Sequence, residues 1–365
     1  MEVSQLSNFK EQLIIRSKVK DYYYLNFIED LNTTLTDLIN DINNIFVIDK
    51  NVSKTFNSNI NNLLQHSRII YINSGENAKT LDYIQTIIEK LINLDIKRNN
   101  KIVAIGGGVT QDIVAFISTI LFRGIDWIFL PTTLLAQCDS CIGSKSSINF
   151  IKYKNLLGTF NPPTNIFIDI KFLNTLSDAD IKSGIGEMYH YFLPFNLEAA
   201  IELNHKYDDI LKNRTMLKDF IFKSLTIKKK IIEIDEFDKD IRHVFNYGHT
   251  FGHAIETITN YEIVHGQAVT LGMDLANYIS LKLNLINHNY FLELHNILNK
   301  NLPKFSFTDQ NIKQYIIALS KDKKNINASL GCILMSKDNN IKKYHIQIDE
   351  LLTSYILEYT KLYSL

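Results

Sequence analysis

The stretch KIVAIGGGVTQDIVAFISTILF, residues 101 to 122, joins a short apolar run to a longer amphipathic run through three glycines. The first run is rich in the β-branched residues of strands, and the second has apolar residues at helical spacing. Glycine tolerates the backbone conformations that a sharp turn between the two requires. The stretch therefore predicts a strand that leads directly into a helix.

The same alternation continues on both sides of this stretch. Strand-like runs that end in Gly, Pro, Ser or Asp occur at residues 45–49, 68–74, 126–131 and 165–170. Amphipathic helical segments lie between them, as in AKTLDYIQTIIEKLINL, residues 78–94. Strands that alternate with helices indicate an α/β fold with a parallel sheet.

From about residue 176 the strand signals nearly vanish, and long helical patterns replace them, for example at residues 213–235 and 266–286. A chain of 365 residues is also too long for one ordinary core. We therefore expect two domains: a Rossmann-like parallel-sheet domain at residues 1–175 and a mostly α-helical domain at residues 176–365.

Composition excludes several classes of protein. Lys plus Arg and Asp plus Glu both number 39, so there is no global basic field for nucleic acid. No uncharged apolar run approaches the ~20 residues that cross a bilayer, and the N-terminus lacks the apolar segment of a signal peptide. Three cysteines fit a reducing compartment. We expect a cytoplasmic protein with no nucleic-acid or membrane partner.

Cys138 and Cys141 form a CxxC pair without a second pair to complete a four-sulfur zinc cage. The pair could be redox-active or half of a metal site, and the alternative is two small side chains near a turn.

Polar residues gather where the predicted strands end. The GGGVTQD segment, residues 106–112, lies where backbone N–H groups at a helix N-terminus can receive a phosphate. Taken alone, it could be only a tight strand-to-helix connection. Ligands bind at the carboxyl ends of parallel strands, and the polar residues that follow these ends are Glu76, Lys79, Asp112, Thr132 and Thr133.

A second group of chemistry-bearing residues lies in RHVFNYGHTFGHAIE, residues 242–256. Four of them are spaced four, three and four apart and so are expected on one helix face: Arg242, Asn246, His249 and His253. Two helical histidines, His265 from a loop and a carboxylate from another helix would suit Zn²⁺ or a similar ion. A single helical histidine is more often a surface or hydrogen-bonded residue, but four such residues on one stripe favour a site.

A third group lies in LLAQCDSCIGSKSSINFIKYKNLLG, residues 134–158, which we expect to be a loop. Its small residues would let the backbone approach a ligand closely, and its polar members are Asp139, Lys145, Lys154 and Asn155. The alternative is a solvated surface loop.

These blocks together resemble the dehydroquinate synthases of the sugar phosphate cyclase superfamily, from about Asp49 to Lys324. The matching blocks, in order, are GGGVTQD, FRG, LPTTLLAQCDS, IGSKSSIN, KNLLG, GEMYH, RHVFNYGHTFGHAIE and VHGQAV. The resemblance implies that NAD⁺ oxidises one hydroxyl of a small seven-carbon phosphorylated keto acid, phosphate leaves, the hydride returns and the opened chain closes to a carbocycle. It also implies a bound Zn²⁺ or Co²⁺ and a homodimer.

The resemblance implies site residues by motif. For the metal these are Glu187, His249 and His265. For substrate and catalysis they are Asp139, Lys145, Asn155, Lys228, Arg242, Asn246, His253 and Lys324, with Arg123 directed to a neighbouring subunit's phosphate. For NAD they are Asp49, Glu76, Lys79, Gly107, Gly108, Asp112, Thr132, Thr133, Lys145, Lys154, Phe172 and Thr175.

Two positions depart from the family pattern. His190 stands where the family commonly has a lysine, and Gln267 replaces the glutamate of an HGE motif. His190 could be a fourth metal ligand, a hydrogen-bonding replacement for the lysine, or the mark of a different substrate. The alternatives are therefore another sugar phosphate cyclase, of the 2-epi-5-epi-valiolone, 2-deoxy-scyllo-inosose or aminodehydroquinate type, a metal-dependent NAD alcohol dehydrogenase, or a non-enzymatic descendant.

Overall fold

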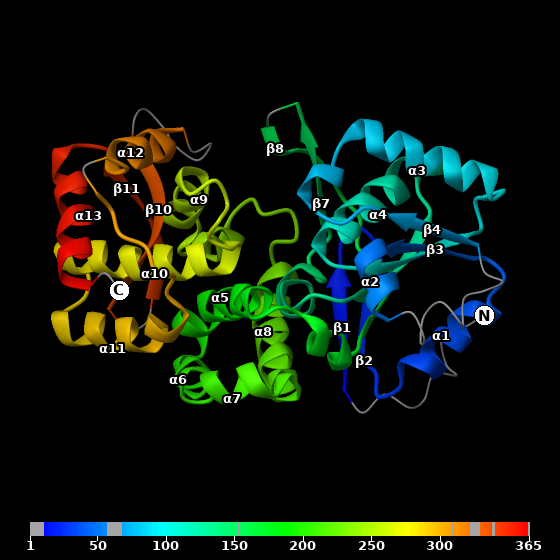
Figure 1. The fold of residues 1–365 in the computed structure, drawn as a ribbon, viewed down its shortest axis with the longest axis horizontal. Coiled ribbons are helices and arrows are strands. Elements are labelled where there is room, and N and C mark those ends of the chain that lie inside the picture. The colour runs from blue at the N-terminus through cyan, green and yellow to red at the C-terminus, as the bar shows by residue number, and fades with distance from the viewer. Residues whose placement is uncertain are drawn as a thin grey trace. The chain divides into compact units, whose positions relative to one another are not determined.

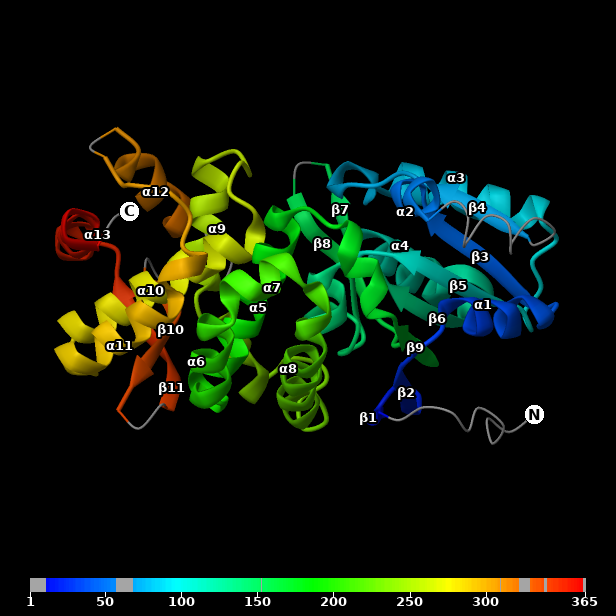
Figure 2. The ribbon, with the colours of Figure 1, turned by 60° about the horizontal axis from the view of Figure 1, so that its bottom comes forward.

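A seven-stranded sheet organises the first part of the chain (Figure 1), and its strands follow the order β1-β2-β9-β6-β5-β3-β4 (Figure 2). β1 and β2 are antiparallel, and every other neighbouring pair is parallel. The strands are β1 (Gln12–Ser17), β2 (Asp21–Phe27), β3 (Asn44–Asp49), β4 (Ile69–Ile72), β5 (Lys101–Gly106), β6 (Asp126–Pro131) and β9 (Asn165–Ile168). The predicted α/β fold with a parallel sheet is confirmed.

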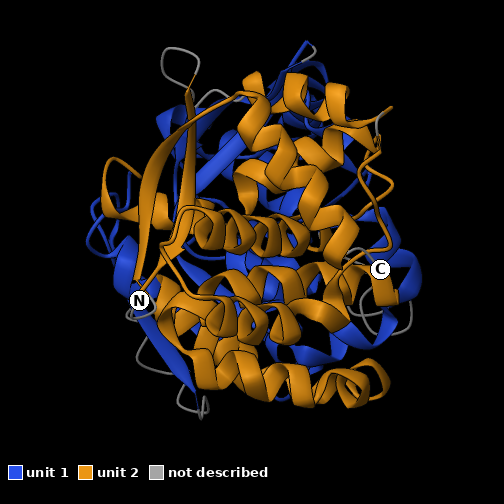
Figure 3. Ribbon diagram, turned by 90° about the vertical axis from the view of Figure 1, so that its left-hand side faces the viewer, with its two compact units in different colours: residues 1–176, 229–237 blue, residues 177–228, 238–365 orange. Residues whose placement is uncertain are grey.

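The computed structural model describes residues 11–56, 68–151, 153–308, 310–321, 329–337 and 340–363. Two compact units divide the chain (Figure 3): residues 1–176 with 229–237, and residues 177–228 with 238–365. Among the described residues, no helix has both the length and the apolar character needed to cross a membrane.

The sheet of the first unit is covered by helices, as a parallel sheet must be. All six residues of β3 are buried, which explains why its sequence is a continuous apolar run instead of an alternating one. Phe46, Val103, Ile105, Phe167 and other buried residues form one core. The helices of this unit are α1 (Leu31–Asn40), α2 (Lys50–Thr55), α3 (Leu81–Asn93) and α4 (Gly108–Ile120).

The segment at residues 134–158 is not the loop that the sequence suggested. It contains a π-helical turn, η4 (Ala136–Ser140), and an antiparallel hairpin of β7 (Lys145–Phe150) and β8 (Tyr153–Phe160). The small residues that suggested a loop also permit close strand pairing, since a Cβ on Gly158 would lie 2.3 Å from the Ser146 carbonyl oxygen. Cys138 and Cys141, at the start of this segment, are buried free cysteines.

Helix α10 (His265–Lys282) is the central element of the second unit, and it packs against α5, α9, α11, α13 and β10 (Figure 2). The other helices of the unit are α5 (Asp178–Phe195), α6 (Leu197–His205), α7 (Tyr207–Lys212), α8 (Leu217–Ile232) up to residue 228, α9 (His249–Ile258), α11 (His288–Leu298), α12 (Ile312–Ser320) and α13 (Glu350–Tyr363). The unit is mostly helical, as predicted. It also contains an antiparallel pair that the sequence did not reveal, β10 (Ser329–Ser336) and β11 (Asn340–Gln347).

Residues 229–237 belong to the first unit, whereas the sequence assigned everything after residue 175 to the second domain. Carboxylates bind this segment to the end of β1 and to the turn that follows. Glu233 Oε1 accepts a hydrogen bond from the Arg16 N–H (2.8 Å), and Glu236 accepts bonds from Ser17 Oγ (2.8 Å) and the Lys18 N–H (2.6 Å). These long-range bonds have no signature in the local sequence.

Candidate active site

Two glycines bring α5 and α10 into backbone contact. A Cβ on Gly186 would lie 1.9 Å from the Gly266 carbonyl oxygen, and a Cβ on Gly266 would lie 1.7 Å from that of Ser183. The Gly266 N–H also donates to Ser183 Oγ at 3.0 Å. Because Glu187 and His265 are the chain neighbours of these glycines, the close crossing brings a carboxylate and an imidazole together.

A third glycine determines where α9 begins. Gly248 has a φ of +80°, in the left-handed region that favours glycine, and α9 starts directly after it at His249. The preceding residues form a separate 3-10 segment, η7 (Ile241–Asn246). The prediction that all four residues share one helix face is therefore wrong, because Arg242 and Asn246 lie in η7, apart from His249 and His253. The last two do share a face of α9, with ring centroids 5.4 Å apart.

These three helices assemble a compact set of metal-binding atoms. Glu187 Oε1 lies 3.0 Å from His265 Nε2 and 3.6 Å from His249 Nε2. Among the described residues, ring nitrogens of His249, His253 and His265 lie within 4.8 Å of one another. Glu187 Oε1 is buried without a hydrogen-bond partner. A buried, unsatisfied carboxylate oxygen between imidazole nitrogens is the chemistry of a divalent-cation site.

Each of the two imidazoles that face Glu187 Oε1 has a partner on its other ring nitrogen. His265 Nδ1 lies 3.1 Å from Glu256 Oε2, and His249 Nδ1 lies 3.2 Å from the Tyr247 carbonyl oxygen. With a hydrogen on each Nδ1 directed at these oxygens, each Nε2 would be free to give its lone pair to a cation bound beside Glu187 Oε1. The prediction from sequence assigned no role to Glu256, although its spacing from His249 and His253 along α9 was visible.

The pKa values of Glu187, His249 and His265 are shifted in different directions by burial and by neighbouring charges. Burial alone would raise the pKa of Glu187, but the neighbouring histidines hold it well below its usual range. Burial lowers the pKa of His249 well below its usual value against the opposing charge of Glu187. Burial would also lower the pKa of His265, but Glu187 and Glu256 together raise it well above its usual value. The cluster thus favours an anionic carboxylate beside a neutral His249.

The predicted substrate residues of the second unit lie on several elements. Lys228 of α8 and Arg242 of η7 are buried, at 5% and 6% exposure. Asn246 donates its side-chain N–H to the His243 carbonyl oxygen at 3.1 Å, and His253 is exposed. Lys324 lies outside the described residues.

Gln267, the other departure from the family pattern, makes a long-range hydrogen bond within the second unit. Its side-chain N–H donates to the Asn301 carbonyl oxygen at 3.3 Å, in η8 (Asn299–Asn301). Asn301 in turn donates to Thr270 Oγ1 at 2.7 Å and to the Lys182 carbonyl oxygen at 3.2 Å. The departure is thus explained by the contact between α10 and η8.

The predicted NAD residues of the first unit follow the carboxyl ends of its parallel strands. Asp49 ends β3, where it caps α2 and accepts a hydrogen bond from Ser74 Oγ at 2.5 Å. Gly107 is the N-cap of α4, and a Cβ there would lie 2.8 Å from Thr133 Cγ2. The Thr132 N–H donates to the Gly106 carbonyl oxygen at 2.9 Å. The strand-to-helix turn therefore leaves backbone N–H groups at the start of α4 uncapped by any side chain.

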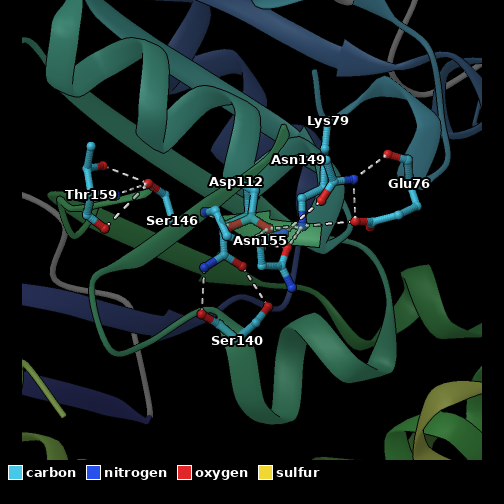
Figure 4. A network of polar contacts seen from close by, with 10 residues as sticks. Glu76, Lys79, Asp112, Ser140, Ser146, Asn149, Asn155 and Thr159 are labelled. Carbon is cyan, nitrogen blue, oxygen red and sulfur yellow. Dashed lines mark hydrogen bonds and ion pairs between the residues drawn. The ribbon is translucent and has the colours of Figure 1, made fainter. Parts of the chain in front are cut away.

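Lys79 is the centre of a polar network in the first unit (Figure 4). Its Nζ lies 2.7 Å from Asp112 Oδ2 and donates to Asn155 Oδ1 at 2.8 Å and to Ser147 Oγ at 3.2 Å. Asp112 also accepts bonds from the Ser147 N–H (2.9 Å) and Oγ (3.0 Å). Burial raises the pKa of Asp112 above its usual value, against the opposing effect of Lys79. The network links α4 to the β7–β8 hairpin.

Sequence reasoning missed two members of this network, Ser147 and Asn149. Asn149 donates to Glu76 Oε1 at 2.9 Å, and its own side-chain oxygen accepts the Asn155 N–H at 2.9 Å. Both residues alternate along β7 and so share one face of that strand. The alternation would have been a usable signal if the segment had been predicted as a strand.

The other predicted residues of the first unit occupy varied positions. The Phe172 side chain is in the core, 1% exposed and 4.9 Å edge-on from Phe56, so it is closed to a ligand. Thr175 Oγ1 donates to the Phe172 carbonyl oxygen at 3.1 Å. Gly108 begins α4. Lys145, Lys154 and Arg123 are exposed, and Asp139 is half-buried in η4.

Two known protein families match consecutive parts of the chain. Residues 69–183 match the 3-dehydroquinate synthase N-terminal family, and residues 184–325 match the 3-dehydroquinate synthase C-terminal family. The 3-dehydroquinate synthase of Thermoanaerobacter sp. (strain X514) is 33% identical over 339 residues, which cover 91% of this chain and 95% of that protein.

Two solved structures share the fold. A 2-deoxy-scyllo-inosose synthase, complexed with carbaglucose-6-phosphate, NAD⁺ and Co²⁺, has a TM-score of 0.80 at 24% identity, covering 95% of this chain and 99% of that one. The 2-epi-5-epi-valiolone synthase of Streptomyces hygroscopicus subsp. jinggangensis, with NAD⁺ and Zn²⁺ bound, has a TM-score of 0.80 at 20% identity, covering 93% and 96%. With sequence identity to curated relatives along nearly its whole length, the chain belongs to the 3-dehydroquinate synthase family.

Proposed function

We propose that the chain is a 3-dehydroquinate synthase, which converts 3-deoxy-arabino-heptulosonate 7-phosphate to 3-dehydroquinate and phosphate. The reaction passes through transient oxidation, phosphate elimination, reduction and intramolecular aldol closure, so it is a lyase reaction with no net redox change. The observation that carries the proposal is the Glu187–His249–His265 donor set in a chain of this family.

The donor set fits a divalent ion such as Zn²⁺ or Co²⁺. One carboxylate oxygen and two imidazole nitrogens are borderline-hard ligands, and three protein ligands are what a catalytic zinc site with an open position uses. We propose Glu187, His249 and His265 as the ligands, because Glu187 Oε1 is buried without a hydrogen bond and both Nε2 atoms face it. A bound ion would supply Lewis-acid stabilisation of negative charge on a substrate oxygen.

The first unit fits a dinucleotide. Its polar residues follow the carboxyl ends of adjacent parallel strands, the usual place for such a ligand. The uncapped start of α4 would receive a phosphate group on its backbone N–H groups. A bound NAD⁺ would supply a reversible hydride acceptor that is regenerated in each turnover.

The chain's own polar residues would bind and orient an anionic substrate. We assign Lys228, Arg242 and Asn246 to its carboxylate and phosphate, since buried cations suit such groups. We assign His253, exposed beside the donor set, to proton exchange with the substrate. We also assign Asp139, Lys145 and Asn155 to substrate binding.

The proposal includes a cytoplasmic homodimer, in which Arg123 contacts the substrate phosphate of the neighbouring subunit. Phe122 and Arg123 both have positive φ values, of 52° and 66°. Two consecutive non-glycine residues in this region are costly, and such strain concentrates at functional sites. The exposed Arg123 side chain is therefore held by an unusual turn.

A second candidate is another sugar phosphate cyclase, and His190 in place of the family's usual lysine favours it. A coupled assay of phosphate release separates the two, using the seven-carbon keto acid phosphate, sedoheptulose 7-phosphate and glucose 6-phosphate in parallel. We expect release only from the keto acid phosphate, with trace NAD⁺ supporting many turnovers and no steady accumulation of NADH. Preferential turnover of either sugar phosphate that lacks a carboxylate would overturn the assignment, and stoichiometric NADH from a simple alcohol would indicate a dehydrogenase.

A further inference from the structure

His190 lies one helical turn after Glu187 on α5, and its ring is enclosed. The residue is 2% exposed. The ring lies against Tyr191, with centroids 3.9 Å apart and the planes tilted by 39°, and meets Phe245 edge-on at 5.9 Å. Aromatic packing thus fixes the orientation of an imidazole beside a candidate metal ligand.

The two oxygens of Glu187 have different neighbours. Oε1 lies 3.0 Å and 3.6 Å from the Nε2 atoms of His265 and His249. Oε2 lies 3.0 Å from His190 Nδ1, within ion-pair distance although the pair does not have the alignment of a hydrogen bond. His190 therefore faces the oxygen that is turned away from the two ligand nitrogens.

This arrangement repeats the support given to the two histidines. His265 has Glu256 on its far nitrogen, and His249 has the Tyr247 carbonyl oxygen on its far nitrogen. Groups behind metal ligands fix the orientation of those ligands and are worth 10–100-fold in metal affinity. Each of the three proposed ligands thus has one such group behind it.

We infer that His190 is a positioning residue for the metal site, which holds Glu187 Oε2 and leaves Oε1 to the ion. The inference rests on the proposed function, because it concerns the metal site of that reaction. His190 then does more than stand in the place of the family's lysine, because its ring, enclosed by aromatic side chains, orients a metal ligand.

The test compares Zn²⁺ affinity, by competition with a chromophoric chelator, among variants of full-length protein. His190→Phe keeps the ring packing but cannot donate, and we expect it to lose about 10–100-fold in affinity. The pair His190→Gln and His190→Met has similar shape, and only glutamine can donate. We expect the His190→Gln variant to bind Zn²⁺ at least about tenfold more tightly than the His190→Met variant. This difference remains measurable if the phenylalanine variant does not fold.

His295→Leu is the matched control, since His295 Nδ1 also contacts a carboxylate, Asp274 Oδ2 at 2.7 Å, away from the donor set. It should lower stability and leave Zn²⁺ affinity within about twofold. Equal Zn²⁺ affinity of the glutamine and methionine variants would overturn the inference. X-ray absorption of the Zn²⁺ form showing one imidazole fewer in His190→Phe would also overturn it, because His190 would then be a ligand. A wild-type protein that binds Zn²⁺ but forms no dehydroquinate would contradict the proposed function alone.

Discussion

Gly186 of α5 and Gly266 of α10 touch through their backbones, so that a Cβ on the first would lie 1.9 Å from the carbonyl oxygen of the second. No rotation of a side chain can relieve a clash between a Cβ and backbone. The separation of the two helices is therefore set by the absence of side chains at the crossing, and the neighbouring Glu187 and His265 depend on it.

Gly186→Ala should therefore force the two helices apart and separate Glu187 Oε1 from His265 Nε2. We expect a loss of at least ~2 kcal/mol in the free energy of unfolding and more than ~10-fold in Zn²⁺ affinity. Urea unfolding and chelator competition measure the two. The control is Gly108→Ala in α4, where a Cβ would lie 3.7 Å from its nearest neighbour, Ser140 Oγ. Unchanged Zn²⁺ affinity in Gly186→Ala would contradict this account.

His249 and His253 should separate metal binding from catalysis. Because His249 Nε2 lies 3.6 Å from Glu187 Oε1, His249→Ala should lower both turnover and Zn²⁺ affinity, the latter by more than ~100-fold. His253 is exposed, and His253→Ala should lower turnover while Zn²⁺ affinity stays within ~10-fold. Metal analysis after dialysis, with assays in excess Zn²⁺, distinguishes them. Equal metal loss in both variants would instead assign His253 to the ligand set.

Lys79 should stabilise the first unit through Asp112. Lys79→Met leaves a buried carboxylate without its cation, which we expect to cost roughly 2–4 kcal/mol in unfolding free energy. Adding Asp112→Asn should recover part of that loss, since the amide is neutral. Lys20→Met is the control, because its 2.8 Å ion pair with the half-exposed Asp126 should be worth under ~1 kcal/mol. Additive effects of Lys79→Met and Asp112→Asn in a double-mutant cycle would refute the coupling.

Lys79→Met should also weaken NAD⁺ binding, because the network orders the β7–β8 hairpin. We expect a Kd raised by roughly 10-fold or more, about 1.4 kcal/mol, in titration calorimetry. Faster amide exchange confined to β7 and β8 would locate the change. A normal Kd with destabilised protein would show that the network is structural only.

The His295–Asp274 pair should make stability depend on pH. Burial alone would lower the pKa of His295, but the hydrogen bond and charge of Asp274 raise it above 6.5. Because this pKa is higher in the folded state than in the unfolded state, the pair stabilises the protein fully below pH 6.5. That stabilisation is lost as the pH rises through the pKa of the folded state. The unfolding free energy of wild type minus that of His295→Gln should therefore fall between pH 5.5 and pH 8.5. His288→Gln, an exposed site on the same helix, is the control, and a pH-independent difference for His295→Gln would disprove the assignment.

The parallel strands could be predicted because burial on both faces gives continuous apolar runs, as in β3 and β5. β1, β2, β10 and β11 could not, since their pairing partners and not their composition determine them. In β11 most residues are exposed or half-buried, and lysines occupy successive positions. The hairpin of β7 and β8 was missed for a related reason, because serine and glycine are frequent in loops.

The donor residues could be predicted from their types and local spacing, but the distances between them could not. Glu187 and His265 are far apart in sequence, and their meeting depends on the contact of Gly186 with Gly266. Gly248 was a readable signal, because a glycine before two histidines can end one helical segment and begin another. The role of Glu256 required the ring orientation of His265, which only the folded chain supplies.

The assignment of residues 229–237 to the first unit means that the polypeptide passes between the two units three times. A single proteolytic cut between residues 176 and 177 would therefore leave them joined by covalent links. Neither unit corresponds to one uninterrupted segment of the gene. A fragment that starts at residue 177 would expose Glu233 and Glu236 without Arg16, Ser17 and Lys18, so two carboxylates would lose their hydrogen-bond donors. Expression of the second unit alone would need a short linker in place of residues 229–237.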